Sequence, residues 1–157
     1  MARKPLIRFC LAVFVPALVA GAVAAHSDEG RSPAQKARHE HYEQLGDAFK
    51  SLRDNLKGDA PDWAKLEKAA QAVVEASVDQ QKWFAKGTGP EAGKTRALPV
   101  IWEKTDDFTA AQKLFSDRAP KLLAAAKAQD TAAVQAAFKE VGGACKNCHD
   151  TFRKPEE

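Results

Sequence analysis

Long hydrophobic runs, period-two alternation and methionine are all scarce in this chain. The longest apolar run, from Phe9 to about Ala20, falls short of the ~20 residues needed to span a membrane. No segment alternates apolar and polar residues for long, which argues against β-strands. The 157 residues include one methionine and three cysteines, and an apolar share of 45% excludes a disordered chain. The length suits one compact domain with a short leader.

Residues 1–25 have the three-part layout of a secretory signal peptide. A basic start is followed by an apolar core, and small residues then precede a cut before Ala25 or His26. We expect this leader to be removed. The mature domain, residues 26–157, is then expected in the bacterial periplasm with no membrane attachment.

Removal of the leader changes the charge of the protein. The whole chain has 24 Lys and Arg against 21 Asp and Glu, a formal net charge of +3. Three of the basic residues and none of the acidic residues lie in the leader, so the mature chain is formally neutral. No basic patch with interleaved aromatics remains, and we expect no nucleic-acid partner. Met1 and Cys10 leave with the leader, so the mature domain keeps two cysteines and no methionine.

Four segments repeat apolar residues at helical spacing. We expect helices from the Ser32 cap to Gly58, from Asp62 toward Phe84, from Val100 or Asp106 to Lys127, and from an Asp130 or Thr131 cap to Phe152. Pro120 is expected to kink or divide the third helix. Residues 87–99 are rich in glycine and proline and form a connection. The pattern predicts an all-α fold, an antiparallel four-helix bundle.

The segment Cys145-Lys146-Asn147-Cys148-His149 carries the clearest chemistry in the sequence. The spacing C-x-x-C-H is typical of covalent c-type haem attachment. Two thiols three positions apart lie on one helical face, and each can take up one haem vinyl group. The adjacent imidazole of His149 can then reach the iron as its proximal ligand.

Three other interpretations of this motif are weaker. A thioredoxin-like redox pair needs a βαβ context, whereas the pattern here is helical. A structural zinc site needs a fourth ligand, for which His26, His39 and His41 are the candidate donors. A disulfide within one helix is geometrically awkward. We therefore expect one covalent haem c, with its iron, near the C-terminus.

The position of the motif at the end of the last helix is uncommon among small c-type cytochromes. Other segments add to it: an arginine-bearing first helix (38–56), Trp83-Phe84 before a glycine-rich loop, the run from Thr95 to Trp102, Val141-Gly142-Gly143-Ala144 before the motif, and Phe152-Arg153-Lys154 after it. With these features the chain resembles cytochrome c prime, the class II four-helix-bundle cytochromes, over nearly the whole mature domain.

The resemblance implies a periplasmic haem protein, usually a homodimer, whose iron is often five-coordinate and high-spin. Such proteins bind nitric oxide and carbon monoxide and are credited with electron transfer or nitric oxide tolerance. Carried over to this sequence, the resemblance makes Cys145 and Cys148 the haem attachment sites and His149 the proximal ligand. It places Arg153 beside that histidine and Arg38 near the haem propionates.

The sixth coordination position of the iron lacks its usual residue. In low-spin relatives a methionine stands four residues after the first-helix arginine, but here Tyr42 occupies that place and the mature chain has no methionine. His41 or His39 is the rival ligand, which would give a six-coordinate, low-spin electron-transfer cytochrome. A phenol with an ordinary pKa of ~10 would have to lose its proton to bind iron. We therefore expect five-coordinate iron, screened by Tyr42 with Leu45 and Phe49.

Two functions follow from these alternatives. One is a gas-binding haem module for nitric oxide and carbon monoxide, and the other is an electron carrier with a periplasmic redox partner. An open sixth position favours gas binding, because a ligand change at the iron adds reorganisation to electron transfer. A peroxidase-like enzyme would need a distal acid–base pair, for which His41 is the only nearby candidate, so we expect no enzymatic activity.

Overall fold

Helices account for most of the computed structural model, which describes residues 29–58, 60–78 and 80–155. The elements are α1 (Pro33–Asn55), α2 (Trp63–Val78), η1 (Gln80–Phe84), η2 (Pro90–Ala92), α3 (Val100–Glu103), α4 (Thr105–Lys127) and α5 (Thr131–Phe152). The predicted leader, residues 1–25, lies outside the described part of the chain. Over the described residues, no helix combines the length and apolar content that a membrane span requires.

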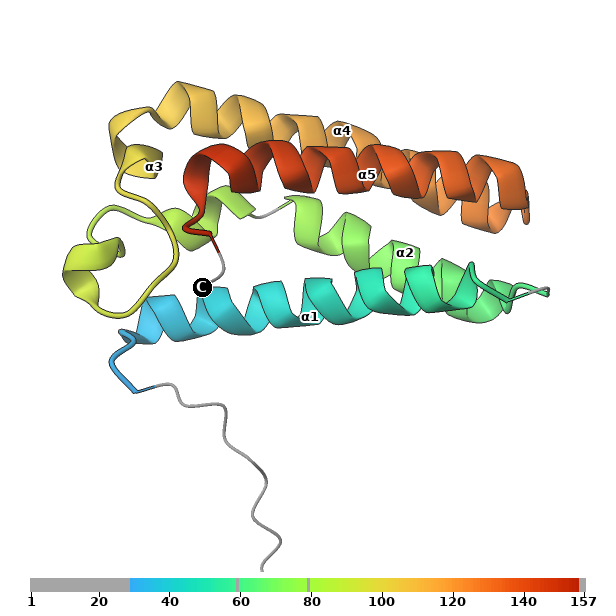
Figure 1. Cartoon of the computed structure of the whole chain (residues 1–157), viewed down its shortest axis with the longest axis horizontal. Coiled ribbons are helices and arrows are strands. Elements are labelled where there is room, and N and C mark those ends of the chain that lie inside the picture. The colour runs from blue at the N-terminus through green and yellow to red at the C-terminus, as the bar shows by residue number, and fades with distance from the viewer. Residues whose placement is uncertain (1–28, 59, 79, 156–157) are drawn as a thin grey trace, which may run out of the picture.

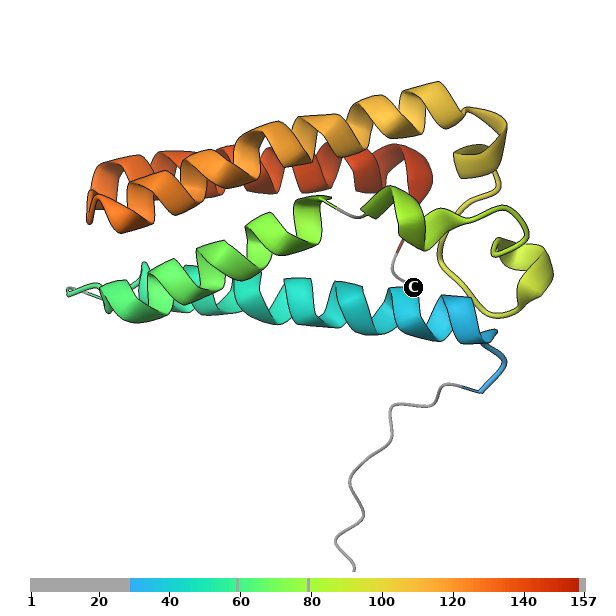
Figure 2. The same ribbon diagram turned by 180° about the vertical axis from the view of Figure 1, so that it is seen from behind.

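The four long helices form the predicted antiparallel bundle (Figures 1 and 2). α1 packs on α2, α2 packs on α4, and α4 packs on α5. The long connection between η1 and α3 lies at the end of the bundle where α1 begins and α5 ends. The fold therefore gathers the chemistry-bearing ends of α1 and α5 near one irregular loop.

Capping residues set where the helices begin. The Ser32 hydroxyl accepts a hydrogen bond from the backbone N–H of Gln35 (3.4 Å). In return, the side-chain oxygen of Gln35 accepts one from the backbone N–H of Ser32 (2.9 Å). This reciprocal pair is a capping box and confirms the predicted start of α1. At α5 the cap is Asp130, whose carboxylate accepts a hydrogen bond from the Ala133 amide.

Two expectations about the middle helices need correction. The second helix ends at Val78, and the chain reaches Phe84 as a 3₁₀ turn instead. The division expected at Pro120 is wrong, because α4 continues through this residue. Proline has no N–H, so the carbonyl one turn earlier in α4 loses its helical hydrogen bond. Because Pro120 is exposed, water can bond this carbonyl instead. The interruption falls at Lys104, whose backbone (φ −119°, ψ 60°) separates α3 from α4.

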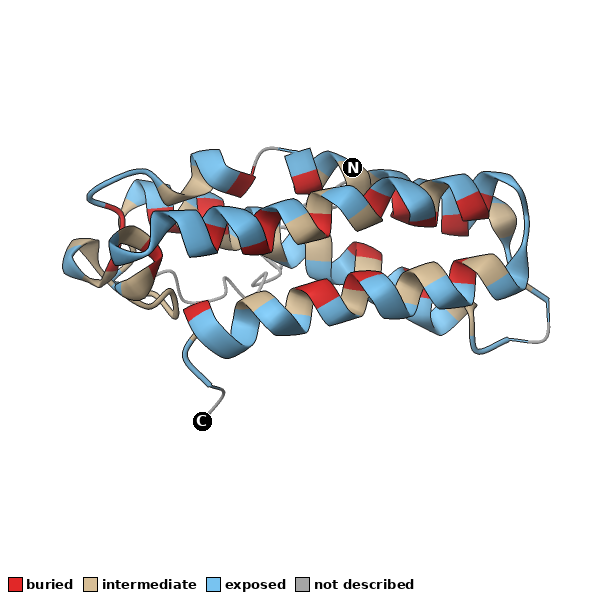
Figure 3. Cartoon of the chain, turned by 90° about the horizontal axis from the view of Figure 1, so that it is seen from above, coloured by how far each residue is buried: buried red, intermediate tan, exposed pale blue. Residues whose placement is uncertain are grey.

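Buried residues recur along all the long helices (Figure 3), and the apolar ones among them form two separate clusters. The main core draws on all four long helices and includes Leu52, Leu66, Leu122, Val134 and Val141, each fully buried. The end core, beside the irregular loop, comprises Ile101, Phe108, Ala111 and Phe152. Such burial stabilises a bundle mainly through the apolar area that it removes from water.

The irregular loop is fixed to α1 by a buried glutamine. Gln35 is 2% exposed, and its amide nitrogen donates hydrogen bonds to the carbonyls of Gly89 (2.7 Å) and Gly93 (3.3 Å). Gly93 has a φ of +141°, and a Cβ there would collide with the Gly30 carbonyl and with the Gln35 amide oxygen. The close approach of loop and helix thus requires glycine at this position.

Replacement of Gly93 by alanine should therefore destabilise the protein. We expect Gly93→Ala to lower the free energy of unfolding by about 1–3 kcal/mol, because both the backbone angle and the close contacts become strained. Gly46→Ala is the matched control: Gly46 lies on the exposed side of α1 with open space around it. That change should raise stability by roughly 0.5–1 kcal/mol. Chemical denaturation measures the free energy of unfolding of both variants. Equal changes in the two would contradict the requirement for glycine at position 93.

Candidate functional site

The two cysteines of the motif lie one helical turn apart on the inner side of α5. Both are half-buried free thiols. Cys145 packs against the main core, whereas Cys148 packs against the end core. Burial raises the pKa of Cys148 to about 11, with a further contribution from Cys145, and burial also raises the pKa of Cys145. The motif therefore presents two neutral thiols at the boundary between the two cores.

His149 follows the thiols at the open end of α5. Its side chain is exposed and borders a hollow of about 620 Å³, whose other lining residues are Arg96, Asp150, Arg153, Lys154 and Pro155. The chain after α5 is tied to the irregular loop: the Leu98 amide donates to the Phe152 carbonyl (3.0 Å) and the Lys154 amide to the Arg96 carbonyl (2.8 Å). The end of α5, with its histidine, is held in place by these bonds.

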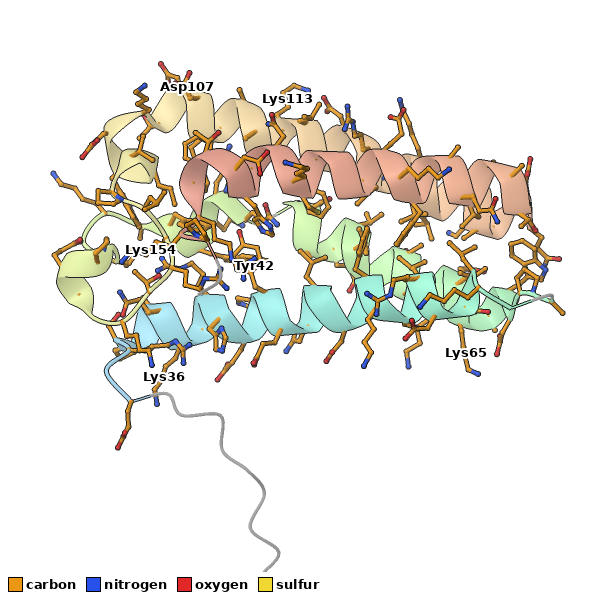
Figure 4. All side chains as sticks on the ribbon, viewed as in Figure 1. Lys36, Tyr42, Lys65, Asp107, Lys113 and Lys154 are labelled. Atoms are coloured by element: carbon orange, nitrogen blue, oxygen red, sulfur yellow. The ribbon has the colours of Figure 1, made fainter. Side chains whose placement is uncertain are left out.

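Tyr42 extends from α1 toward α5 (Figure 4), and the two cysteines of α5 are near enough to act electrostatically on its phenol. Its side chain occupies the space between α1 and α5 and meets the rings of Trp83 (centroids 5.2 Å apart) and Phe84 (6.2 Å) edge-on. Burial is the main cause that raises the pKa of the phenol well above its usual value, and Cys148 raises it further. The structure thus brings Tyr42 within electrostatic reach of Cys145 and Cys148, while its role at the iron, which the resemblance implies, stays a prediction.

The two histidines of α1 have other partners. The His41 ring is exposed and stacks on Trp83, with centroids 4.6 Å apart and planes 11° apart. The Nε2 of His39 lies 3.2 Å from the Glu43 carboxylate, one turn along the same helix. Of these three α1 side chains, Tyr42 is the one that packs between two aromatic rings and lies within electrostatic reach of the cysteines.

Arg38 is buried one turn before Tyr42. Only 4% of it is exposed, and its guanidinium donates to the Trp83 carbonyl (3.2 Å), to the Thr88 hydroxyl (3.1 Å) and carbonyl (3.0 Å), and to the Thr95 hydroxyl (3.1 Å). The same group lies 4.7 Å from the centre of the Phe84 ring. Burial lowers the pKa of Arg38, but an arginine stays charged in proteins.

Several of these partners have no signature in the sequence. Thr88 and Thr95 lie in a loop and bond an arginine 50 and 57 residues away, so no local spacing predicts them.

Gln112 is a further residue that the sequence analysis missed. It is 4% exposed and occupies an apolar position of α4, between Phe108 and Phe115. A polar residue inside a helical apolar stripe was the one signal that could have identified it.

The donor set fits covalent haem better than the alternatives. A structural zinc site requires about four clustered ligands, and the described residues hold no group of three or more His, Cys, Asp or Glu side chains that could bind a metal. Haem attachment requires two accessible thiols and a neighbouring imidazole, all of which α5 supplies. The hydrogen-bond acceptors around Arg38 are all neutral and the Glu91 carboxylate acts on it only through its charge, so an anionic haem propionate would further balance this buried positive charge.

Comparisons with known proteins agree with this interpretation. The cytochrome c′ of Pararhodospirillum photometricum is 39% identical over 109 residues, which cover 69% of this chain and 86% of that protein. A nitric oxide complex of a mutant cytochrome c prime from Alcaligenes xylosoxidans is similar in structure, with a TM-score of 0.71, 33% identity, and coverage of 78% of this chain and 94% of that chain.

A second solved structure is similar to the same degree. It is described as a cytochrome c′ with an unusual ligand-controlled dimer dissociation, and its TM-score is 0.71 with 28% identity, covering 78% of this chain and 95% of that chain. A family model described as Cytochrome C′ matches residues 33–153, which include all four long helices and the C-x-x-C-H motif. The chain therefore belongs to the cytochrome c′ family, and its cofactor is one covalently bound haem c.

Proposed function

We propose that this protein is an exported, periplasmic haem protein that binds nitric oxide and carbon monoxide at five-coordinate, high-spin iron. The observation that carries the proposal is the place of Tyr42. The residue across from the cysteines on α1 is a phenol packed among aromatic rings rather than a methionine or a histidine. The nitric oxide complex of the similar A. xylosoxidans protein supports the same activity here.

The chain's own residues divide the work of holding the cofactor. Cys145 and Cys148 would hold the haem through thioether links to its two vinyl groups, and His149 would be the iron's protein ligand. Arg153 lies just past the end of α5, where the backbone is already extended, so the same-face helical relation to His149 does not apply; it lines the same hollow as His149 and would add positive charge there. Arg38 places its buried charge near the propionates. The bound haem would supply the reversible binding of diatomic gases at its ferrous iron.

The aromatic surroundings of Tyr42 decide what reaches the distal side. Trp83 contacts Tyr42 edge-on, and Leu45 and Phe49 continue the same side of α1 toward the main core. These rings and methyl groups exclude water and leave little room for bulky molecules. Small diatomic ligands need only a small displacement of the Tyr42 ring to enter.

Other parts of the proposal concern the setting of the protein. Residues 1–25 act as the signal peptide, and the domain begins near residue 26. The relative with ligand-controlled dimer dissociation supports a homodimer here. A redox partner in the periplasm is compatible with the same haem, since a covalent haem can also exchange electrons. We propose no enzymatic activity.

Optical and magnetic spectra of the purified mature protein test the proposed iron state. We expect high-spin ferric spectra near neutral pH and a reversible carbon monoxide adduct of the ferrous protein, because α1 offers no strong sixth ligand. Cys145→Ser and Cys148→Ser should each leave haem with a single thioether, which the pyridine haemochrome spectrum detects as a shift to longer wavelength. Purely low-spin ferric iron would instead favour His41 or His39 as a sixth ligand.

A substitution at Tyr42 tests the screening of the distal side. Tyr42→Ala removes the ring and should accelerate carbon monoxide association by about tenfold or more, which corresponds to roughly 1.4 kcal/mol in the barrier. Tyr42→Phe keeps the ring and should change the rate by less than about threefold. Stopped-flow or flash photolysis measures both rates, and equal rates in Tyr42→Ala and the unmodified protein would show that the ring does not limit entry.

A further inference from the structure

Gln112 is a buried polar residue that the proposed function does not use. Its side chain is 4% exposed, and neither its amide nitrogen nor its amide oxygen has a hydrogen-bond partner. Within the described residues, these are the only buried side-chain atoms in that condition. An unsatisfied buried amide costs about 1–3 kcal/mol. A group that completes these bonds is therefore expected beside α4.

The pairing of α4 with α5 places Gln112 level with the haem motif. The rings of Phe108 and Phe152 meet at 5.1 Å, and ten residues further along α4 the Arg118 side chain donates to the Glu140 carbonyl (2.8 Å). In this antiparallel register, one turn beyond Phe108 on α4 corresponds to one turn before Phe152 on α5. Gln112 is thus opposite Cys148, on the neighbouring helix.

Gln112 also lies at the boundary between the two cores. Phe108, one turn before it, belongs to the end core, and Phe115, one turn after it, belongs to the main core. Cys148 packs against the end core, and Cys145 packs against the main core. The unpartnered amide and the two attachment thiols therefore share one level of the bundle.

We propose that Gln112 is a haem-pocket residue whose amide N–H donates a hydrogen bond to an acceptor carried by the haem unit. This inference rests on the proposed function. Haem offers two acceptors that can reach a buried amide: a propionate carboxylate, and a diatomic ligand on the iron. Both have the same chemistry toward the N–H group, and each gives a different measurable signal when the bond is lost.

The test uses the haem-loaded protein with Gln112→Leu, a replacement of similar volume that cannot form hydrogen bonds. If a propionate is the acceptor, its charge is less compensated in the variant, so the reduction potential falls while the C–O stretching frequency of the ferrous carbonyl stays constant. If the iron-bound gas is the acceptor, the C–O frequency rises and carbon monoxide dissociates about fivefold to tenfold faster. Either result supports the proposal.

Two further variants keep the test decisive. Gln135→Leu makes the same change at an exposed position of α5. It should alter neither the reduction potential nor the C–O stretching frequency. Gln112→Glu keeps the shape, and its protonated form is again a donor, so lowering the pH should return the affected quantity toward its original value. A merely structural role would not produce this rescue.

Failure of the two proposals can be told apart. The pyridine haemochrome spectrum reports covalent haem in every variant, and an unmodified protein without haem would overturn the proposed function itself. If haem is attached but Gln112→Leu and Gln135→Leu agree in both potential and C–O frequency, this inference alone is wrong. If Gln112→Leu fails to accumulate, Gln112→Glu provides the test. A reduction potential and a C–O frequency that both stay constant as the pH is lowered would overturn the inference.

Discussion

The buried guanidinium of Arg38 is the interaction on which the site end of this bundle depends. Its four hydrogen bonds join α1 to three points of the chain between residues 83 and 95. That stretch contains only short 3₁₀ turns, and ordering such backbone costs about 1–2 kcal/mol per residue. Charge-assisted hydrogen bonds are stronger than neutral ones, so one arginine can offset a substantial part of this cost.

The position of Arg38 on α1 links the loop to the pocket. Gln35 bonds the same loop one turn earlier, and Tyr42 follows one turn later. Gln35 and Arg38, on one stripe of α1, therefore hold the loop, and Tyr42, on the same stripe, lies within electrostatic reach of the cysteines. Because the rings that pack on Tyr42 come from η1, next to the loop, the geometry of the pocket depends on how firmly the loop is held.

A bundle with two separate cores suits a large planar cofactor. The main core includes fully buried side chains of α1, α2, α4 and α5. The end core packs the loop and α3 against α4 and α5. The thiols lie where the two cores meet, so a haem attached to them borders both.

The sequence predicted the elements whose causes are local. Helical stripes, the Ser32 cap and the spacing of Cys145 and Cys148 each depend on residues within a few positions of one another, and all are found as expected. Pro120 does not divide α4 as one form of the prediction had it, because the helix loses only one hydrogen bond at this exposed residue; a kink there stays a prediction. Contacts between distant segments were out of reach: nothing near Thr88 indicates that it bonds Arg38.

The opposite end of the bundle is built quite differently. There the Asn55 side chain accepts a hydrogen bond from the Asp62 amide (2.9 Å) and donates one to the Asp62 carbonyl (2.8 Å), so a short turn closes α1 onto α2. Asn55 is thirteen residues from Tyr42 along a continuous helix, a separation of about 20 Å. The exposed residues of this turn are thus a suitable point of attachment: a fluorophore or an electrode linker fixed at Lys57 would report on the protein without touching the chemistry at its other end.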